Sequence, residues 1–289
     1  MDERHSNDEH GIATARRRVV EFKGSEGREF QDELVLEAYL TLVTADRTLA
    51  LLACTPRHLD ELAAGFAYNH GLLQGATRPP QLRVMPKPRK PGEYMAEVVL
   101  PDDVQLAQTK WAAMEWQHSP RGSGQPTADL TLSGLGPVAR RPADEPMLPA
   151  IEAQALARQL QGASAIFAAT GAVHAAALAS PGPDGWHITV MREDVGRHNA
   201  VDKVAGWCLL NGVSTHDKVL MVTCRISADI VGKALAMDVP VLLSRSAPTF
   251  RAIETADRAG LTVLGFARGD RFVAYTHWDR IAGDVSCPG

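Results

Sequence analysis

The sequence predicts an α/β protein, α+β overall, in which a smaller β-rich N-terminal region precedes a larger α/β domain. From Pro149 onwards, strand-like runs alternate with helical patterns of about 10–13 residues, which is typical of parallel βαβ units. Residues 118–149, in contrast, are rich in Ser, Pro, Gly and Arg and predict a long linker loop. We therefore expect a disordered tail over 1–24, the β-rich region with one helix and the linker over 25–145, and the α/β domain over 146–289.

Composition excludes several classes of protein. The 289 residues carry a formal net charge of −4, which does not favour a nucleic-acid coat or a membrane-surface binder. Apolar residues make up 45% and charged residues 22%, the mix of an ordinary globular protein. The polar start has no apolar segment of a secretory signal, and no run approaches the ~18 apolar residues of a membrane span. We therefore expect a cytoplasmic protein without a membrane or nucleic-acid partner.

The N-terminal region begins with charged residues that lack an apolar period, which predicts disorder. Within them, the run Arg16-Arg17-Arg18 is interpreted as a solvated face rather than a contact patch. A helix is expected from Thr55-Pro56, because a hydroxyl N-cap precedes a proline at the first helical position. Alternating or continuous apolar runs predict strands around it: Leu34–Val43, Thr48–Cys54, Gln81–Met85 and Tyr94–Leu100.

The C-terminal region contains more regular signals. Apolar residues at helical spacing predict four helices: Ile151–Leu160, Asn199–Leu210, Ser227–Met237 and Pro248–Ala259. Buried or paired runs predict the strands that alternate with them: Ala175–Ser180, Trp186–Met191, Val219–Thr223, Val239–Leu243, Leu261–Phe266 and Arg271–Thr276.

Three strand-to-helix turns in this region are rich in Arg, Ser and small residues: Arg192–Asn199, Thr223–Asp229 and Ser244–Thr249. Ligands of open α/β sheets bind beyond such strand ends, where helix N-termini present free N–H groups and arginine suits phosphate. Together the turns predict an anion pocket for a nucleotide-like or pyrophosphate ligand. For any single turn the alternative is that its polar residues only cap helices or hold the turn, as Ser227, Asp229, Thr249 and Asp194 could do.

Only four cysteines occur, and the closest two lie 16 residues apart, so the chain has no CxxC. This excludes a zinc ribbon, a thioredoxin-type pair and a disulfide scaffold. Cys54 and Cys208 are expected in the core and Cys287 in a frayed tail. Cys224 is the single catalytic candidate, since it ends a strand beside Arg225. It is either a thiol whose pKa is lowered by the helix start or a small residue that fills a tight turn.

Two histidines lie near the predicted pocket. His174 lies in an apolar stretch, where a hydrogen-bonded core histidine is the usual outcome, although Gly171 suggests a turn near a site. His198 lies at a helix start, where a positive charge is disfavoured, so we expect it to be neutral.

Zinc-dependent base deaminases combine H-x-E at one helix start with P-C-x-x-C at the next. The corresponding turns here have Ala200 in place of the glutamate and Ser227 in place of the second thiolate. With no acid/base residue and an incomplete ligand set, the sequence predicts no zinc site.

The chain resembles the formate dehydrogenase accessory sulfurtransferases of the FdhD type across residues 30–280. Its most specific segment is Glu193-Asp-Val-Gly-Arg-His-Asn-Ala-Val-Asp-Lys203. The other matching segments are Thr55–Phe66, Thr170–Leu178, Arg225–Lys233, Pro240–Thr249 and Gly265–Phe272.

The resemblance implies a cytidine-deaminase-like, three-layer C-terminal domain without zinc. It also implies binding of molybdenum bis(molybdopterin guanine dinucleotide) and sulfur relay from a cysteine desulfurase to that cofactor, for the catalytic subunit of a formate dehydrogenase. A homodimer is compatible with it. The implied cofactor-binding residues are His174, Arg197, His198, Asn199, Ser244, Arg245, Phe266, Ala267, Arg268, Gly269, Asp270 and Arg271.

One departure from the family concerns its sulfur carrier. Family members have a Ser-Cys-Gly-x-Cys-Gly-like motif in the linker, whereas this chain has Leu132-Ser-Gly-Leu-Gly-Pro137. Without a thiol, no persulfide can form there. Two hypotheses follow: a sulfurtransferase that uses another thiol, with Cys224 as the candidate, or a non-catalytic chaperone that binds the cofactor.

Overall fold

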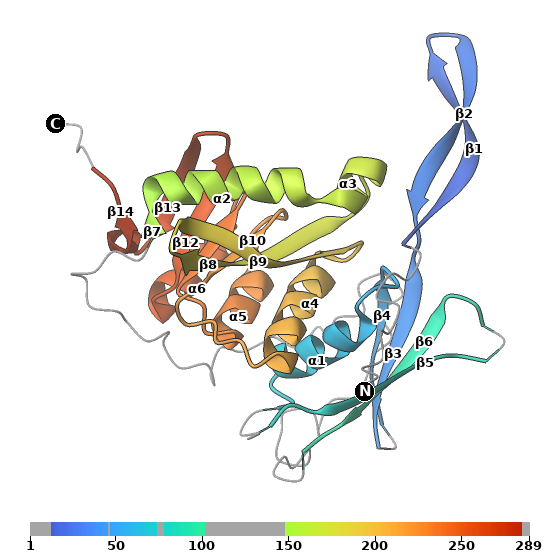
Figure 1. The fold of residues 1–289 in the computed structure, drawn as a ribbon, viewed down its shortest axis with the longest axis horizontal. Coiled ribbons are helices and arrows are strands. Elements are labelled where there is room, and N and C mark those ends of the chain that lie inside the picture. Colours follow the sequence, from blue (N-terminus) through green and yellow to red (C-terminus); the bar gives the residue numbers. More distant parts are fainter. Residues whose placement is uncertain (1–12, 46, 74–77, 89, 102–147, 285–289) are drawn as a thin grey trace, which may run out of the picture.

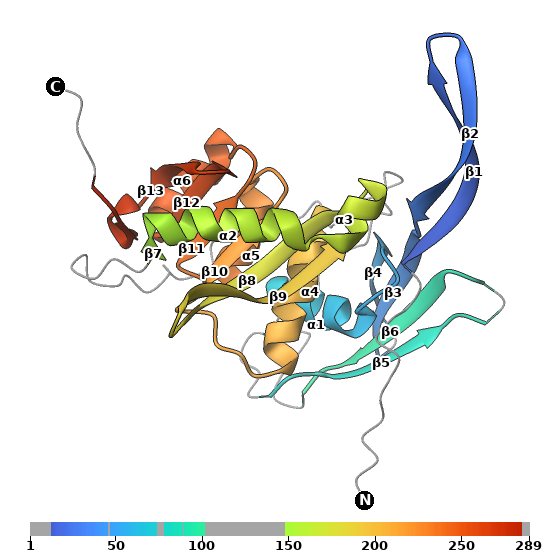
Figure 2. The same ribbon diagram turned by 45° about the horizontal axis from the view of Figure 1, so that its top comes forward.

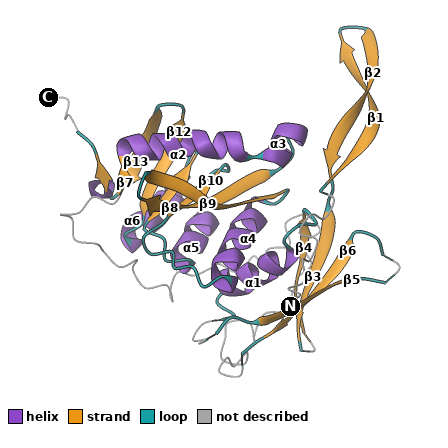
Figure 3. Cartoon of the chain, viewed as in Figure 1, coloured by secondary structure: helices purple, strands orange, loops and turns teal. Residues whose placement is uncertain are grey.

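The computed structural model describes residues 13–45, 47–73, 78–88, 90–101 and 148–284. Among them are a six-stranded sheet with helices on both faces, a four-stranded sheet that packs on one further helix, and a projecting two-stranded hairpin (Figures 1 and 3). The predicted linker motif Leu132–Pro137 and Cys287 lie outside the described residues.

The six-stranded sheet has the order β13-β12-β11-β10-β8-β9. Its three central strands, β10 to β12, are parallel, while β8, β9 and β13 run antiparallel to their neighbours. Its strands are β8 (His174–Gly182), β9 (Gly185–Asp194), β10 (Val219–Val222), β11 (Val241–Ser244), β12 (Thr262–Arg268) and β13 (Arg271–Thr276). The carboxyl ends of β10 to β12 therefore meet the amino end of β8, which brings the three predicted turns and His174 to one edge.

Helices cover both faces of this sheet, which gives three layers (Figure 2). On one face lie α4 (Arg197–Leu210), α5 (Ala228–Ala236) and α6 (Phe250–Ala259). On the other lie α2 (Ala150–Ala163) and the short α3 (Ala165–Thr170). Each face buries its own apolar cluster, as the alternation of strands and helices predicted. The predicted α/β class is confirmed.

The second sheet has the order β4-β3-β6-β5, formed by β3 (Ala38–Thr44), β4 (Arg47–Cys54), β5 (Gln81–Pro86) and β6 (Glu93–Val99). Its apolar face packs on α1 (Leu59–Asn69). The prediction that Thr55 caps this helix is wrong. The helix begins at Leu59, after His58 in a left-handed conformation with φ 52°. Thr55 instead bonds to the β9–α4 turn, because its Oγ1 accepts from the Val195 N–H at 3.2 Å.

Helices α1 and α4 cross at two glycines. A Cβ atom on Gly65 would lie 1.7 Å from the Asp202 carbonyl oxygen, and one on Gly206 would lie 1.8 Å from the Glu61 carbonyl oxygen. The backbones therefore touch, and no side chain fits between them. This contact joins the four-stranded sheet, through α1, to the helical layer of the larger one.

The hairpin consists of β1 (Thr14–Lys23) and β2 (Glu26–Val35), joined at Gly24, whose φ is 64°. The prediction of disorder is therefore wrong for residues 14–23. Each of these residues finds a partner on β2, and such long-range pairing leaves no mark in the sequence of one strand. Arg16, Arg17 and Arg18 are exposed on this hairpin, and their interpretation as a solvated face stays a prediction.

Short elements complete the chain. The strands β7 (Leu148–Pro149) and β14 (Ile281–Ala282) pair in parallel, and a 3₁₀ turn, Trp278–Arg280, precedes β14. No helix among the described residues is long and apolar enough to cross a membrane.

Candidate anion-binding site

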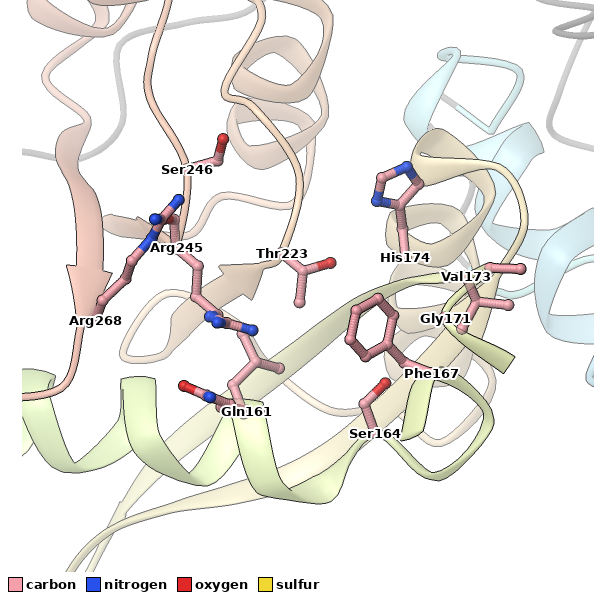
Figure 4. A pocket seen from close by; sticks show the side chains of 12 residues that line it. Gln161, Ser164, Phe167, Gly171, Val173, His174, Thr223, Arg245, Ser246 and Arg268 are labelled. Carbon is pink, nitrogen blue, oxygen red and sulfur yellow. The ribbon is translucent and has the colours of Figure 1, made fainter. Parts of the chain in front are cut away.

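A cavity of about 420 Å³ lies at the edge where the predicted turns meet. Figure 4 shows Arg245, Ser246 and Arg268 on one side of it, and His174 and Phe167 on the other. Thr223, directly after β10, lies between them. Its Oγ1 accepts a hydrogen bond from the Ala175 N–H at 3.0 Å, which joins the end of β10 to β8 at the bottom of the cavity. Of the predicted cofactor-binding residues, the structure brings His174, Arg245 and Arg268 to this cavity.

The two arginines give the cavity its positive side. Arg245 follows β11, and its Nε is buried without a hydrogen-bond partner among the described residues. Arg268 ends β12 and donates from its Nε to the Arg245 carbonyl oxygen at 2.8 Å. A buried guanidinium N–H without a partner costs free energy, and an anionic group would supply the missing acceptor. The arrangement therefore suits a phosphate or carboxylate group.

An irregular strand positions Arg268. The pairing of β12 with β13 shifts register between Gly265 and Arg268, and Phe266 within this bulge has a φ of 51°. A positive φ is unusual for a residue with a large side chain and often marks a functional site. Bulges re-aim the side chains next to them, so this one accounts for the direction of Arg268 into the cavity.

Helix α3 forms the opposite wall and was not predicted from the sequence. Ser164, Phe167 and Gly171 come from it or its ends. Glu193, the last residue but one of β9, holds this helix: its carboxylate accepts from Ser164 Oγ at 2.5 Å and from the Phe167 N–H at 3.0 Å. The sequence feature that could have indicated this helix is Gly171, which ends it in a left-handed conformation with φ 67°.

The remaining predicted contacts do not line this cavity. Asn199 is buried and donates from Nδ2 to the Ala53 carbonyl oxygen at 2.8 Å and to Asp194 Oδ1 at 3.0 Å. Ser244 is buried and donates to the Cys224 carbonyl oxygen at 2.6 Å. Ala267 packs in the core against α2. The turn residues Gly269, Asp270 and Arg271 are exposed beyond Arg268. Their contact with a cofactor stays a prediction.

The charged residues around Asn199 form a buried network. Lys203 Nζ lies 2.6 Å from Asp194 Oδ2, and neither side chain is exposed. Asp194 Oδ2 also accepts from the Thr55 N–H at 3.1 Å, and Lys203 donates to the Thr55 carbonyl oxygen at 3.1 Å. The most specific segment of the sequence, Glu193–Lys203, thus uses its ionic residues to join β9, α4 and the segment before α1.

A second buried pair extends this network to α5. Lys233 Nζ lies 2.6 Å from Asp202 Oδ1, which also accepts from Asn69 Nδ2 at 2.8 Å. Asn69 belongs to α1, so one carboxylate connects three helices.

Both predicted histidines favour the neutral state. Burial, Lys233 and Arg197 lower the pKa of His198 to about 3. Burial and Arg197 lower the pKa of the half-buried His174. The expectation of a neutral His198 agrees with this, and burial is the largest cause of the lowered pKa.

The depressed pKa of His198 predicts an acid-sensitive fold. The pKa of His198 is 6.5 in the unfolded chain and about 3 in the folded one, so below pH 6.5 the unfolded chain binds a proton that the folded chain does not. The contribution of His198 to the free energy of unfolding is therefore complete above pH 6.5 and is lost as the pH falls towards 3. Between pH 6.5 and 5 this protonation lowers the free energy of unfolding by about 2 kcal/mol. We expect His198→Gln to flatten the pH dependence of urea unfolding by that amount. An unchanged slope would contradict this assignment.

Cys224 does not behave as an activated thiol. Burial raises its pKa to about 11, although Arg197 and Arg225 pull it down. Of the two alternatives for Cys224, the structure favours the small residue that fills the turn, because the side chain belongs to the buried apolar cluster. Cys54 and Cys208 lie in the core as predicted, with burial raising the pKa of each to about 12. Within the described ranges, no three His, Cys, Asp or Glu side chains converge on a metal-sized site.

Comparisons with known proteins agree on one family. Residues 35–282 match the model of the FdhD/NarQ family. The chain is 34% identical to the sulfur carrier protein FdhD of Geobacillus kaustophilus over 279 residues, covering 94% of this chain and 98% of that protein. It is 32% identical to its namesake in Bacillus subtilis over 273 residues, or 93% and 97% of the two chains.

A solved structure supports the fold. A crystal structure of a protein from Desulfotalea psychrophila, assigned as a formate dehydrogenase accessory protein, superimposes with a TM-score of 0.71. The superposition covers 93% of this chain and 100% of that one at 24% sequence identity. At that identity the similarity establishes the fold.

Proposed function

Because the chain belongs to the FdhD/NarQ family, we propose that it assists the maturation of a molybdenum-dependent formate dehydrogenase by binding the guanine-dinucleotide molybdenum cofactor as cargo. The observation that carries this proposal is the buried, unpartnered Nε of Arg245 beside Arg268 in one cavity. A diphosphate supplies several acceptors to two planar guanidinium groups. We place this step in the cytoplasm, the location that the sequence predicts.

The size of the cavity defines which part of the cargo it would hold. About 420 Å³ is within the range of pockets that take one small ligand, so it would hold one nucleoside diphosphate portion. The pterin and the metal would then lie outside it, accessible to the dehydrogenase. The neutral His174 on the opposite wall would add a polar contact without an additional charge.

The cavity predicts a measurable affinity for GDP. We expect Arg245→Ala and Arg268→Ala to weaken GDP binding by ~1–3 kcal/mol each, as the loss of a charge-assisted hydrogen bond does. Isothermal titration calorimetry measures this directly. Arg258→Ala, on the exposed side of α6, is the matched control and should bind like the wild type. If the wild type and the three variants bind GDP with equal affinity, the cavity is not the GDP-binding site.

The role in sulfur transfer is the second question. The curated relatives are named sulfur carrier proteins. Relay from a cysteine desulfurase is what the family resemblance implies. This chain has no CxxC, and the buried Cys224, Cys54 and Cys208 all have raised pKa values, which disfavours a thiolate nucleophile. We therefore favour cofactor binding and delivery over sulfur carriage.

A labelling experiment separates the two roles. We expect that incubation with a cysteine desulfurase and ³⁵S-cysteine leaves no persulfide on the chain, while GDP binding is retained. The labelled peptide, if any, is identified by mass spectrometry, with Cys224→Ala as the comparison. Label on Cys224 that is lost in Cys224→Ala would restore the sulfurtransferase hypothesis.

A further inference from the structure

The two walls of the cavity differ in their chemistry. One wall carries the guanidinium groups of Arg245 and Arg268, whereas the other is formed by α3 and carries the ring of Phe167 (Figure 4). A nucleoside diphosphate is divided in the same way, because its phosphates are anionic and its base is a flat heterocyclic ring. The α3 wall is therefore the side of the cavity that suits the base.

Phe167 presents its ring to the cavity rather than to the core. The side chain is 47% exposed, while its neighbour Ile166 is only 7% exposed. Phe167 belongs to none of the three buried apolar clusters that the described residues form. Covering an exposed phenylalanine with another flat ring removes apolar area from water and adds a favourable stacking contact. The ring is therefore available to a ligand.

Hydrogen bonds fix the backbone of Phe167 on both sides. Its N–H donates to the Glu193 carboxylate at 3.0 Å, and its carbonyl oxygen accepts from the Gly171 N–H at 2.8 Å. The same carboxylate accepts from Ser164 Oγ at 2.5 Å and from the Ile166 N–H at 3.2 Å. A helix of six residues is not stable alone, so these bonds hold α3 against β9. A wall that is already ordered loses little conformational entropy when a ligand binds.

We propose that Phe167 is the base-binding residue of this cavity, and that its ring stacks on the purine base of a nucleoside diphosphate whose phosphates lie against Arg245 and Arg268. Glu193 is then a positioning residue, because it acts on the ligand only through α3. This inference rests on the proposed function, since the base that the ring meets is the guanine of the proposed cargo. Two probes separate the two ends of the ligand: GDP has both the diphosphate and the base, whereas inorganic pyrophosphate has no base.

The first test measures the affinity for both probes by isothermal titration calorimetry. We expect Phe167→Ala to weaken GDP binding about 5- to 150-fold, the usual loss of one base–aromatic stack, and to leave pyrophosphate binding unchanged. Phe167→Tyr keeps the flat ring and should bind GDP like the wild type. Phe250→Ala is the matched control, because it removes a phenylalanine that is 79% exposed on α6. Arg245→Ala should weaken the binding of both probes.

The outcomes distinguish this inference from the proposed function. If the wild type binds both probes and Phe167→Ala binds GDP as tightly as the wild type, the stacking role of Phe167 is wrong while the diphosphate site stands. If the wild type binds neither probe, the proposed function fails and this inference fails with it. Circular dichroism checks that every variant is folded.

The second test addresses the positioning role of Glu193. We expect Glu193→Ala to weaken the binding of GDP but not of pyrophosphate, because α3 loses the acceptor that holds it. The double variant with Phe167→Ala should bind GDP no more weakly than Phe167→Ala alone, since without the ring there is nothing left to position. If the two losses add, Glu193 does not act through Phe167.

A spectroscopic test observes the ring directly. The seven phenylalanines of the chain can be replaced by 4-fluorophenylalanine, and the Phe167 signal is the ¹⁹F resonance that is missing in Phe167→Tyr. We expect saturating GDP to shift this resonance through the ring current of the stacked base, and pyrophosphate to leave it in place. An unshifted Phe167 resonance in saturating GDP would overturn the proposal.

Discussion

Replacing Lys203 with methionine is expected to lower the free energy of unfolding by about 3–5 kcal/mol. Methionine keeps the length of the side chain but removes the ammonium group that lies 2.6 Å from Asp194 Oδ2. The carboxylate then stays buried without its partner, and the Thr55 carbonyl oxygen loses a donor. Urea unfolding followed by circular dichroism measures the effect.

Two controls separate the loss of an ion pair from the loss of packing. Adding Asp194→Asn to Lys203→Met removes the uncompensated charge, so the double variant should be more stable than Lys203→Met alone. Lys218→Met breaks the pair with Asp217 near the surface and should cost about 0–1 kcal/mol. If Lys203→Met and Lys218→Met cost the same, burial does not decide the strength of the Lys203 pair.

Gly206→Ala is expected to destabilise the chain by about 3 kcal/mol or more, the upper range for overpacking. The new Cβ atom would lie 1.8 Å from a backbone oxygen, which cannot rotate away as a flexible side chain can. Helices α1 and α4 would have to separate and would open the contact between the two sheets. Differential scanning calorimetry should show a lower Tm.

Gly162→Ala is the matched control for this substitution. Gly162 lies in α2, and a Cβ atom added there would have nothing within 4 Å, so alanine should raise stability slightly through its better helix propensity. If both alanine variants lose the same stability, the close approach at Gly206 is not the cause.

The fold of the C-terminal part could be predicted from the sequence because each of its helices and strands has a local sequence pattern. A buried apolar run such as Val219–Val222, or the apolar face of a helix such as α4, can be recognised within about a dozen residues. The hairpin could not be predicted from the sequence, since its strands are polar and stabilise each other across the turn. The start of α1 was misplaced for a related reason: Thr55 bonds to Asp194 and Val195, far away in the chain.

The candidate site could be predicted from the sequence only in part. Two of the three predicted strand-to-helix turns reach the cavity, through Thr223 and Arg245, and the turn Arg192–Asn199 does not line it. Arg268 and His174, which also line it, were expected from the family resemblance. The wall formed by α3 could not be predicted, because Ser164 and Phe167 carry no chemical signal of their own. The sequence left two alternatives open for Cys224, an activated thiol or a small residue in a tight turn. Its pKa depends on burial, which only the packed structure reveals.

The network of Asp194, Asn199, Asp202 and Lys203 has a consequence for how sequences of this kind are interpreted. Their side chains hold together elements that are up to about 150 residues apart in the sequence, so these residues serve the assembly of the chain. The most recognisable segment of the family is therefore explained here by the folding of the chain, and it does not by itself identify a reaction. A test of the chemistry has to address less distinctive residues, Arg245 and Arg268 in the cavity.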